Sequence, residues 1–266
     1  MQLNESSWGS DLAVAALVAK VAAVRLLLVR GRTRRLNVDQ RKRIGDEEAQ
    51  RSIARALRRA RPADAVLSEE AVDDHTRLER SRVWIVDPLD GTREYAEGRS
   101  DWAVHVALWE DGALAAAAVA LPALGRVLTT SSPPILPAQQ RARLRLVVSR
   151  TRPPEVARVV ARSLPADVVA MGSAGYKIAA VIRGDADAYV HAGGQWEWDS
   201  AAPVAVAQAA GLHASRVDGA SLHYNQPHPW QPDLVVCRPE LAERVLEAAA
   251  SYDEGLRAES LLSTQD

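Results

Sequence analysis

Cysteine is almost absent from this chain of 266 residues, in which Cys237 is the only one. An intramolecular disulfide is therefore excluded, and this favours a reducing compartment and a cytoplasmic location. Cys237 follows the apolar run Leu234–Val236, so we expect a small buried core residue and not a reactive thiol. Phenylalanine is missing and lysine is rare, while arginine is abundant. This bias is typical of a GC-rich genome and excludes no function by itself.

Long apolar runs and an excess charge of one sign are also missing. Without about 18 consecutive uncharged apolar residues we expect no membrane-spanning helix. Lys20 and Arg25 interrupt the first apolar run, so we expect no signal peptide. The 33 basic and 34 acidic side chains give a net charge of -1, so no overall field favours nucleic acid or a membrane surface. Hydrophobic residues at 47% and charged residues at 25% are typical of a globular protein.

What the sequence does contain is the segment DPLDGT at 87–92, directly after the apolar run Val83–Val86. The β-branched and aromatic residues of that run predict a buried strand. Pro88 has no N–H to donate, so we expect the strand to end at Asp87 and the chain to turn. Asp90 follows three residues later, and the two carboxylates can converge on one point together with the carbonyl oxygen of Leu89. Gly91 then opens a short helical turn.

Hard oxygen ligands of this kind suit Mg²⁺, which prefers to share its ligands with a phosphate. The N–H groups of Gly91 and Thr92 offer a seat for an anion. An ordinary strand-to-turn junction with aspartates as turn formers is the alternative, but the strand, the proline and the Gly-Thr pair together favour a metal–phosphate site. Phosphatases with an aspartate nucleophile separate their two acids by one residue. Two residues separate Asp87 from Asp90, so both are better placed as ligands.

The first 70 residues predict two helices and a strand. Ser10 caps a helix that begins at Asp11, reaches about Arg30 and ends at Gly31. The basic stretch 32–43 is expected to be a solvated loop, or alternatively a loop that faces an anion over the site. Asp46 is expected to cap a second helix, at a position where an acid could also orient a water. A strand at 65–67 ends in Ser68-Glu69-Glu70, and these two acids are candidate ligands.

Beyond the central motif, the alternating run 102–109, the turn Glu110-Asp111-Gly112 and a return strand at 114–120 predict a hairpin. His105 is expected to be a core or sheet histidine and not a ligand. The segment SSPPILP at 131–137 is the best linker candidate. We therefore divide the chain into an α+β domain over residues 1–137, which carries most metal ligands, and an α/β domain over residues 138–266, which completes the site and the substrate pocket.

The second half alternates between strands and helices. We expect strands at 144–148, 168–169, 188–190 and 234–237, and helices at 153–164, 174–182, 200–211 and 239–250. Asp199 is a natural cap of the third of these helices, where a carboxylate stays ionised and suits a metal. The tail from Tyr252 onwards is expected to fray.

Three blocks now line up: Ser68-Glu69-Glu70, the segment WIVDPLDGT at 84–92, and EWDSAAP at 197–203. In this order they resemble the lithium-sensitive inositol monophosphatase superfamily, over most of the chain. Within the superfamily, the chain is most similar to the bacterial 3′(2′),5′-bisphosphate nucleotidases. The segments that carry this similarity are GSAGYK at 172–177, GDADAY at 184–189 and Glu-Trp-Asp at 197–199. The resemblance implies a layered αβαβα fold like that of the sugar phosphatases. Its N-terminal part has a mainly antiparallel sheet, its C-terminal part is an α/β unit, and the active site lies in the cleft between them.

The resemblance also implies a ligand set for two or three Mg²⁺ ions. Glu69, Asp87 and the Leu89 carbonyl would hold the first ion; Asp87, Asp90 and Asp199 would hold the second; and a looser third lies near Glu69. Paired ions about 4 Å apart can clamp the attacking and leaving oxygens of an in-line displacement.

The implied catalytic residues are Asp46, Thr92 and Glu69. Thr92, with Asp46 behind it, would orient and deprotonate a water that attacks phosphorus directly, without a phosphoenzyme. Relatives usually carry Pro-Val-Thr shortly before the equivalent of Asp46. Here the stretch 41–45 reads RKRIG, so the supporting threonine is absent.

The substrate would contact both halves of the chain. The implied binding residues are Glu69, Leu89, Asp90, Gly91, Thr92, Gly172, Ser173, Ala174, Lys177 and Asp199. Lys177 and Arg150 are each candidates for a second phosphate of the substrate, and each could equally be an ordinary solvated side chain.

The function implied is an Mg²⁺-dependent phosphomonoesterase that removes the 3′-phosphate from adenosine 3′,5′-bisphosphate, and also from its sulfated form, 3′-phosphoadenylyl sulfate. The first alternative is the same chemistry on inositol monophosphate or fructose 1,6-bisphosphate. A non-catalytic nucleotide or metal sensor on the same fold is a second. A nucleic-acid-binding module, suggested only by the arginines between Arg25 and Arg61, is a third. The expected partners are a small phosphorylated nucleotide and a second copy of the chain in a homodimer, with no nucleic acid and no membrane.

Overall fold

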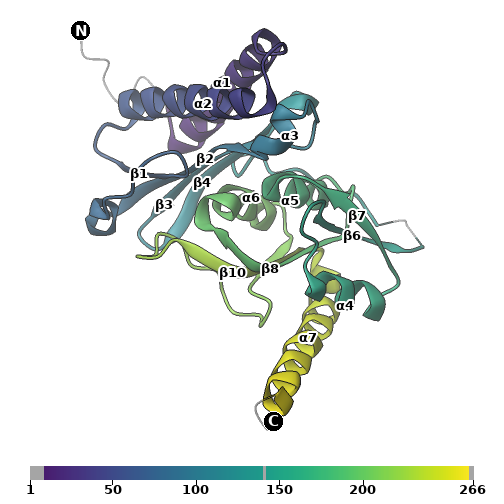
Figure 1. Cartoon of the computed structure of the whole chain (residues 1–266). Coiled ribbons are helices and arrows are strands. Elements are labelled where there is room, and N and C mark those ends of the chain that lie inside the picture. The colour runs from purple at the N-terminus through teal and green to yellow at the C-terminus, as the bar shows by residue number, and fades with distance from the viewer. Residues whose placement is uncertain (1–8, 140–141, 264–266) are drawn as a thin grey trace.

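The computed structural model describes residues 9–139 and 142–263. Helices and sheets alternate in five layers (Figure 1). The first helix pair is α1 (Asp11–Arg32) and α2 (Val38–Ala60). Beneath it lies a sheet in the order β1-β2-β3-β4-β5, made of β1 (Ala65–Ser68), β2 (Arg82–Asp90), β3 (Ala103–Glu110), β4 (Ala113–Leu121) and β5 (Arg126–Thr129). Only β1 and β2 of this first sheet are parallel, so it is mainly antiparallel, as expected.

The second sheet has the order β7-β6-β8-β10-β9. Its strands are β6 (Leu144–Ser149), β7 (Ala166–Met171), β8 (Ala188–Trp196), β9 (His213–Ser215) and β10 (Trp230–Cys237). Strand β6 lies parallel to both β7 and β8, whereas β10 is antiparallel to β8 and β9. The predicted domain boundary at residue 137 falls between β5 and β6. The division of the chain into two domains stays a prediction.

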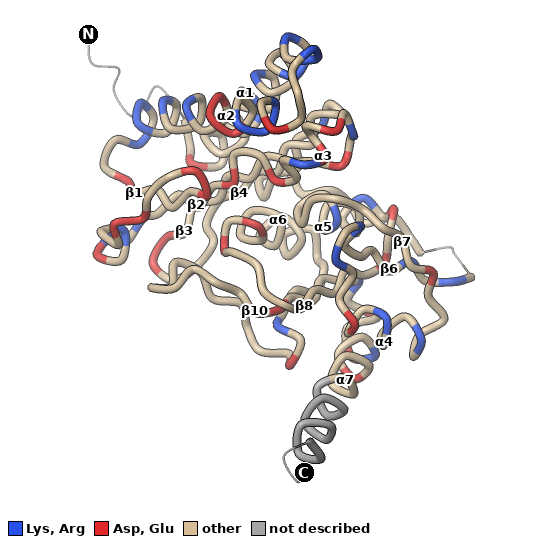
Figure 2. The backbone as a smooth tube through the Cα atoms, in the orientation of Figure 1, with Lys and Arg blue, Asp and Glu red and all other residues tan. Residues whose placement is uncertain are grey.

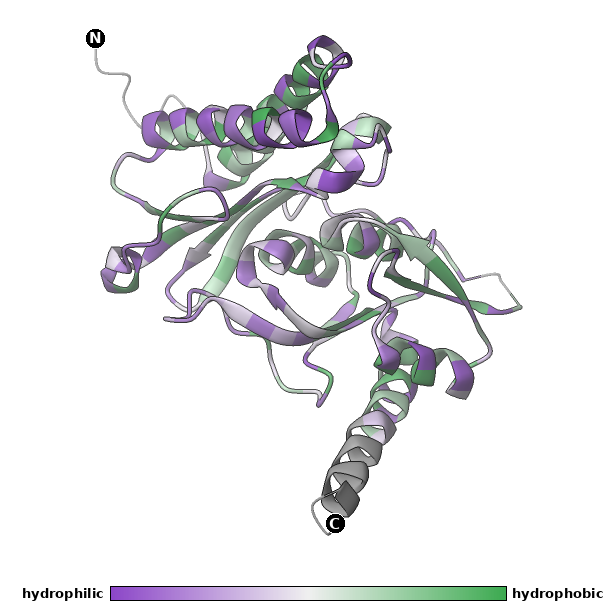
Figure 3. Ribbon diagram, viewed as in Figure 1, coloured by the Kyte–Doolittle hydropathy of each residue, from purple (hydrophilic) through white to green (hydrophobic). Residues whose placement is uncertain are grey.

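Helices α5 (Ala174–Ile182) and α6 (Glu197–Ala209) fill the layer between the two sheets, and α4 (Glu155–Ser163) and α7 (Ala242–Ser263) cover the outer face of the second sheet. Alternation along the strands explains this layering. In β2, Trp84 and Val86 face α1 and α2, while Val83 and Ile85 face the central layer. In Figure 3 the outermost helix α2 is largely hydrophilic, and the strands beneath it are mostly hydrophobic. The layered αβαβα fold is confirmed.

Helix α1 is long and apolar enough to cross a membrane by length and composition alone. Its apolarity is partly explained by packing, because one face is buried against the first sheet and α2. The buried side chains of that face are Val14, Ala15, Val18, Ala19, Ala22, Ala23, Leu26 and Val29.

The expected loop at 32–43 is mostly helix. Helix α1 continues through Gly31 to Arg32, and α2 already begins at Val38, where Asn37 and Gln40 form a capping box. Asp46 therefore lies inside α2, so its prediction as a helix cap was wrong. Within the stretch 32–43, Arg43 pairs with Glu47, and elsewhere in the helix pair Arg25 and Arg51 both pair with Glu48. Figure 2 shows basic residues at the turn between α1 and α2.

Strand β2 also runs further than expected, through Pro88 to Asp90. Strand β1 pairs with β2 only as far as Val86, and the register with β3 shifts by one residue between Asp87 and Asp90. Pro88 therefore lies in a bulge beyond the end of β1, where its missing N–H is tolerated.

In the second half, α6 begins at Glu197 with Trp196 as its cap residue, so Asp199 occupies the third helical position and the prediction of Asp199 as the cap was wrong. Strands β8 and β10 are longer than predicted, β9 was missed, and α7 continues past Tyr252 to Ser263. Between β1 and β2 the chain forms a short 3-10 helix at Thr76–Glu79.

Candidate functional site

Asp90 stands at the end of β2, against the N-terminus of α5. The hydroxyl of Ser173 donates to Asp90 Oδ2 over 2.5 Å, the amide of Gly175 donates to the same oxygen over 2.7 Å, and the amide of Ala174 donates to Oδ1 over 3.2 Å. Amides at a helix N-terminus favour a negative charge. One carboxylate of the first sheet is thus held by a helix of the central layer.

His105, in the neighbouring strand β3, is the imidazole that lies beside Asp90. Its Nε2 lies 3.2 Å from Asp90 Oδ2, and its Nδ1 lies 3.0 Å from the carbonyl oxygen of Trp198. Burial alone lowers the pKa of His105, but the hydrogen bond to Asp90 and the charge of that carboxylate outweigh it and raise the pKa. Conversely, burial raises the pKa of Asp90, but the hydrogen bond and charge of His105, the Ser173 hydroxyl and the charge of Lys177 together outweigh it and lower the pKa.

Gly175 is what allows His105 to come so close to α5. A Cβ atom at position 175 would lie 1.9 Å from His105 Nε2, a distance that no side chain tolerates. His105 is fully buried in the sheet, as expected, but its contact with Asp90 was not predicted.

Asp87 is almost fully buried beside Asp90, and its Oδ1 accepts the amide of Leu89 over 2.9 Å. Burial and the charges of Glu69, Asp90 and Asp199 raise the pKa of Asp87 well above its ordinary value. Ligand atoms of Asp87, Asp90 and His105 all lie within 4.8 Å of one another. Buried carboxylates crowded in this way favour either a proton or a cation between them.

Glu69 follows β1, whose parallel pairing with β2 brings its side chain to Asp87. The Glu69 amide donates to the Val86 carbonyl over 3.3 Å, and the Glu69 carboxyl hydrogen-bonds Asp87. Burial, together with the charges of neighbouring carboxylates, raises the pKa of Glu69 to about 7. Near neutral pH without metal, a proton is therefore shared within the Glu69–Asp87 pair.

Asp46 and Thr92 form the second predicted pair. Thr92 Oγ1 lies 3.2 Å from Asp46 Oδ1 and 3.0 Å from the Leu89 carbonyl oxygen. The pair forms although no threonine precedes Asp46. Gly45 lets α2 approach, because a Cβ atom there would lie 2.7 Å from Tyr95 Cε1. Burial first, and then the charge of Glu70, raises the pKa of Asp46 to about 7.

Asp199 approaches from the first turn of α6. Its Oδ2 accepts the amide of Trp196 over 2.7 Å, which caps the helix. Burial and the charge of Asp90 raise the pKa of Asp199 to about 7. Residues from α2, β1, β2, α3 (Thr92–Ala96) and α6 are thus brought to one corner of the molecule. The predicted residues that meet there are Asp46, Glu69, Asp87, Leu89, Asp90, Thr92 and Asp199.

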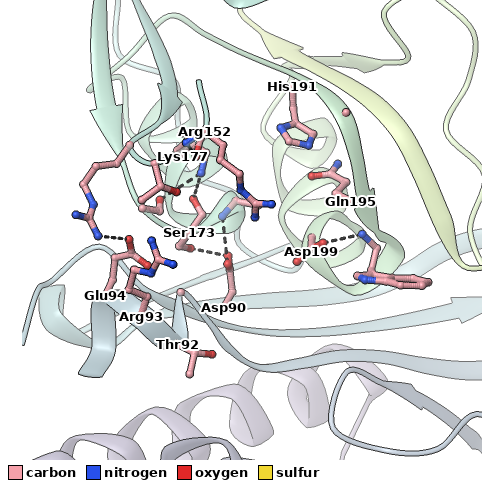
Figure 4. A pocket seen from close by; sticks show the side chains of 18 of the residues that line it. Asp90, Thr92, Arg93, Glu94, Arg152, Ser173, Lys177, His191, Gln195 and Asp199 are labelled. Atoms are coloured by element: carbon pink, nitrogen blue, oxygen red, sulfur yellow. Dashed lines mark hydrogen bonds and ion pairs between the residues drawn. The ribbon is translucent and has the colours of Figure 1, made fainter. Parts of the chain in front are cut away.

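A cavity of about 830 Å³ opens from this corner between the two sheets. Figure 4 shows Asp90 and Asp199 at its floor, with Ser173 and Lys177 along one side and Gln195 and His191 along β8. Of the other residues predicted to bind substrate, Gly91, Thr92, Gly172 and Ala174 also line it, whereas Glu69 and Leu89 do not. The amide of Gly172 is already bonded to Asp101 Oδ2 over 2.7 Å.

Lys177 is buried and is not the solvated helix lysine of the alternative interpretation. Its Nζ donates to the carbonyl of Ser173 over 2.6 Å and lies 5.3 Å from the centre of the Tyr189 ring. Burial lowers the pKa of Lys177 to about 8. Arg150 Nη2 pairs with Glu94 over 2.8 Å and with Glu97 over 3.0 Å, so it braces α3 against the end of β6.

Residues 11–254 match the inositol monophosphatase family. The chain belongs to the inositol monophosphatase family. A relative in this family, the 3′-phosphoadenosine 5′-phosphate phosphatase of Mycobacterium bovis, is 53% identical over 77% of this chain and 80% of its own length. The protein of the same name from Mycobacterium leprae is 48% identical over 89% of this chain and 92% of its own length.

Solved structures of the family share the fold. The structure of CysQ from Bacteroides thetaiotaomicron superposes with a TM-score of 0.75 and 24% identity, covering 88% of this chain and 99% of that protein. Inositol monophosphatase II from Staphylococcus aureus MSSA476 superposes with the same TM-score and 19% identity, over 88% of this chain and 92% of that protein.

Proposed function

We propose that this chain is an Mg²⁺-dependent phosphatase that removes the 3′-phosphate of adenosine 3′,5′-bisphosphate. The observation that carries the proposal is the convergence of Glu69, Asp87 and Asp199 on Asp90, in a relative of proteins named for this substrate. We extend the proposal to 3′-phosphoadenylyl sulfate, whose 3′-phosphate is the same. Such an enzyme would clear a by-product of sulfate activation, and the single buried cysteine fits the cytoplasm.

The donor set fits Mg²⁺. Four carboxylates and the Leu89 carbonyl are hard oxygen donors, and burial together with the charges of neighbouring carboxylates raises the pKa values of Glu69, Asp87 and Asp199, which favours a bound cation. We assign Glu69, Asp87 and the Leu89 carbonyl to one ion, Asp87, Asp90 and Asp199 to a second, and a looser third to the neighbourhood of Glu69. When bound, these ions supply charge neutralisation for the attacking and leaving oxygens.

The chain's own residues supply the proton chemistry. Thr92 accepts a hydrogen bond from the attacking water while its own hydroxyl donates to Asp46, and Asp46 takes up the proton. A carboxylate with a pKa of about 7 is a suitable base near neutral pH. Glu69 orients the same water. The water oxygen forms its bond to phosphorus as the bond to the 3′-oxygen breaks, and the amides of Gly91 and Thr92 hold the phosphate during the transfer.

The cavity also favours a bisphosphate over a monophosphate. Arg93 and Arg152 line it, and neither pairs with a carboxylate within the described residues, whereas Arg150 is engaged by two. Lys177 adds a third cation at its wall. We assign the second phosphate to this basic side of the cavity.

The test is phosphate release from four substrates, with and without Mg²⁺. Adenosine 3′,5′-bisphosphate is expected to be cleaved fastest, ahead of 3′-phosphoadenylyl sulfate, inositol 1-phosphate and fructose 1,6-bisphosphate, and only with Mg²⁺. The proposal is wrong if adenosine 3′,5′-bisphosphate is the poorest substrate. Asp90→Asn removes one ligand charge and is the matched inactive control.

A further inference from the structure

Gln195, the residue before the last of β8, carries an amide without a hydrogen-bond partner. The side chain is only 6% exposed, yet neither Nε2 nor Oε1 bonds to any other described residue. A buried amide left in this state costs free energy unless something else satisfies it. Gln195 lines the cavity between His191 and Asp199 (Figure 4), so a molecule bound in the cavity, or an ordered water, is the partner within its reach.

Two tryptophans form an aromatic wall beside this amide. Trp196 and Trp230 both line the cavity, are each 37% exposed, and meet edge to face with ring centroids 5.0 Å apart. Trp198 stacks on Trp196 from the other side at 5.1 Å. Half-exposed rings with fixed neighbours are the usual platform for a nucleic-acid base.

The backbone keeps this wall in place. Gly194 has a φ of 87°, and a Cβ atom there would lie 1.7 Å from Cζ2 of Trp230, so only glycine lets the indole pack on β8. The amide of Trp196 is bonded to Asp199, so the wall adjoins the proposed metal corner. A nucleotide whose phosphate is bound at that corner has Gln195 and Trp196 within reach along the same cavity wall.

We propose that Gln195, Trp196 and Trp230 form the base-recognition site of this cavity. The amide of Gln195 pairs with an edge of the base that presents a donor next to an acceptor, as adenine does with its amino group and a ring nitrogen. The tryptophans stack on the face of the base. This inference rests on the proposed function and adds to it the residues that select a nucleotide over a sugar or inositol phosphate.

The experiment compares Gln195→Leu, which keeps the size of the side chain but removes its polar atoms, with Trp196→Ala and Trp196→Phe. Each is tested on adenosine 3′,5′-bisphosphate and on the same sugar bisphosphate without its base. Gln195→Leu is expected to lower kcat/KM for the nucleotide about tenfold to a hundredfold relative to the base-free substrate, mainly through KM. Trp196→Ala is expected to lower the same ratio about tenfold, and Trp196→Phe to restore most of it.

Two further measurements separate base recognition from a structural role. The binding of adenosine 5′-monophosphate, followed by calorimetry without turnover, is expected to weaken in Gln195→Leu by the same factor as kcat/KM. Gln208→Leu, an exposed position on α6, is the control and changes neither quantity.

The outcomes distinguish this inference from the proposed function. If the wild type prefers the nucleotide but Gln195→Leu reduces both substrates equally, base recognition by Gln195 is wrong and the proposed function stands. If adenosine 3′,5′-bisphosphate is the poorest substrate of the wild type, the proposed function itself has failed.

Discussion

Replacing His105 with glutamine would test how the central corner is held together. His105 is fully buried and its Nε2 lies 3.2 Å from Asp90 Oδ2, so the substitution removes one member of a buried ion pair. Losing one partner of such a pair typically costs about 3–5 kcal/mol. Asp90 keeps its three bonds from α5, so we expect the lower end, about 3 kcal/mol. For a chain of this size that corresponds to a fall in Tm of roughly 6–12 °C.

The pH dependence of this loss identifies its cause. The pKa of His105 is raised on folding, so its contribution to stability is complete below about 6.5 and is lost as pH rises through the folded pKa. The pKa of Asp90 is lowered, so its contribution is present above about 3.9 and is lost as pH falls through the folded pKa. His105→Gln should therefore cost more free energy of unfolding at pH 6 than at pH 9.

The assay is urea unfolding at both pH values, on the metal-free protein, for the wild type, His105→Gln, Asp90→Asn and the double variant. We expect a coupling free energy of at least about 1 kcal/mol between the two sites at pH 6. A loss that is the same at both pH values, or additive effects in the cycle, would refute the charged pair.

Four further predictions follow from the same contacts. Gly175→Ala should lower stability and activity together, since its Cβ would lie 1.9 Å from His105 Nε2; an unaltered Tm and rate would contradict the packing described. Asp46→Asn should lower kcat about 10²–10⁴-fold with little change in Tm in Mg²⁺, because it removes the proposed proton acceptor; wild-type turnover would rule that role out. The raised pKa values of Asp46, Glu69 and Asp199, each about 7, mean that their contribution to metal-free stability is complete below about pH 4 and is lost as pH rises through 7. Calorimetry should therefore show that the gain in Tm from Mg²⁺ increases from pH 5 to pH 8, and a gain that is constant or falls would argue against these residues as ligands. Cys237 should react with a thiol reagent only on unfolding, because it is fully buried and burial raises the pKa of its thiol to about 12; rapid modification of the native protein would disprove this.

Local sequence patterns predicted most of the layers correctly. The run Val83–Val86 was identified by its β-branched and aromatic residues, and the hairpin at 102–120 by the alternation of its first strand and its Asp-Gly turn. The start of α2 was missed because its first two turns are basic and exposed, and the capping box of Asn37 and Gln40 was the signal that could have revealed it. Strand β9 was missed because it has only three residues.

The residues of the candidate site were likewise predicted only in part. The carboxylates were found because their spacing around the DPLDGT segment is local, and the resemblance to a family supplied the distant Glu69 and Asp199. The contacts of Asp90 with His105 and α5 could not be predicted, because they depend on register and on the space left by Gly175. Gln195 and Trp230 are 35 residues apart in the chain and meet only through the antiparallel pairing of β8 with β10, which places Gln195 opposite Gln231.

The hold of α5 on Asp90 has a consequence for how the protein matures. The carboxylate belongs to a strand made early in the chain, whereas the hydroxyl and amides that grip it come from residues 173–175, beyond the connection to the second sheet. A nascent chain that has completed only its first sheet contains Asp87 and Asp90, but neither Asp199 nor the groups that hold Asp90. The proposed site is therefore complete only when residues 173–175 and Asp199 of the second half are packed against the first sheet.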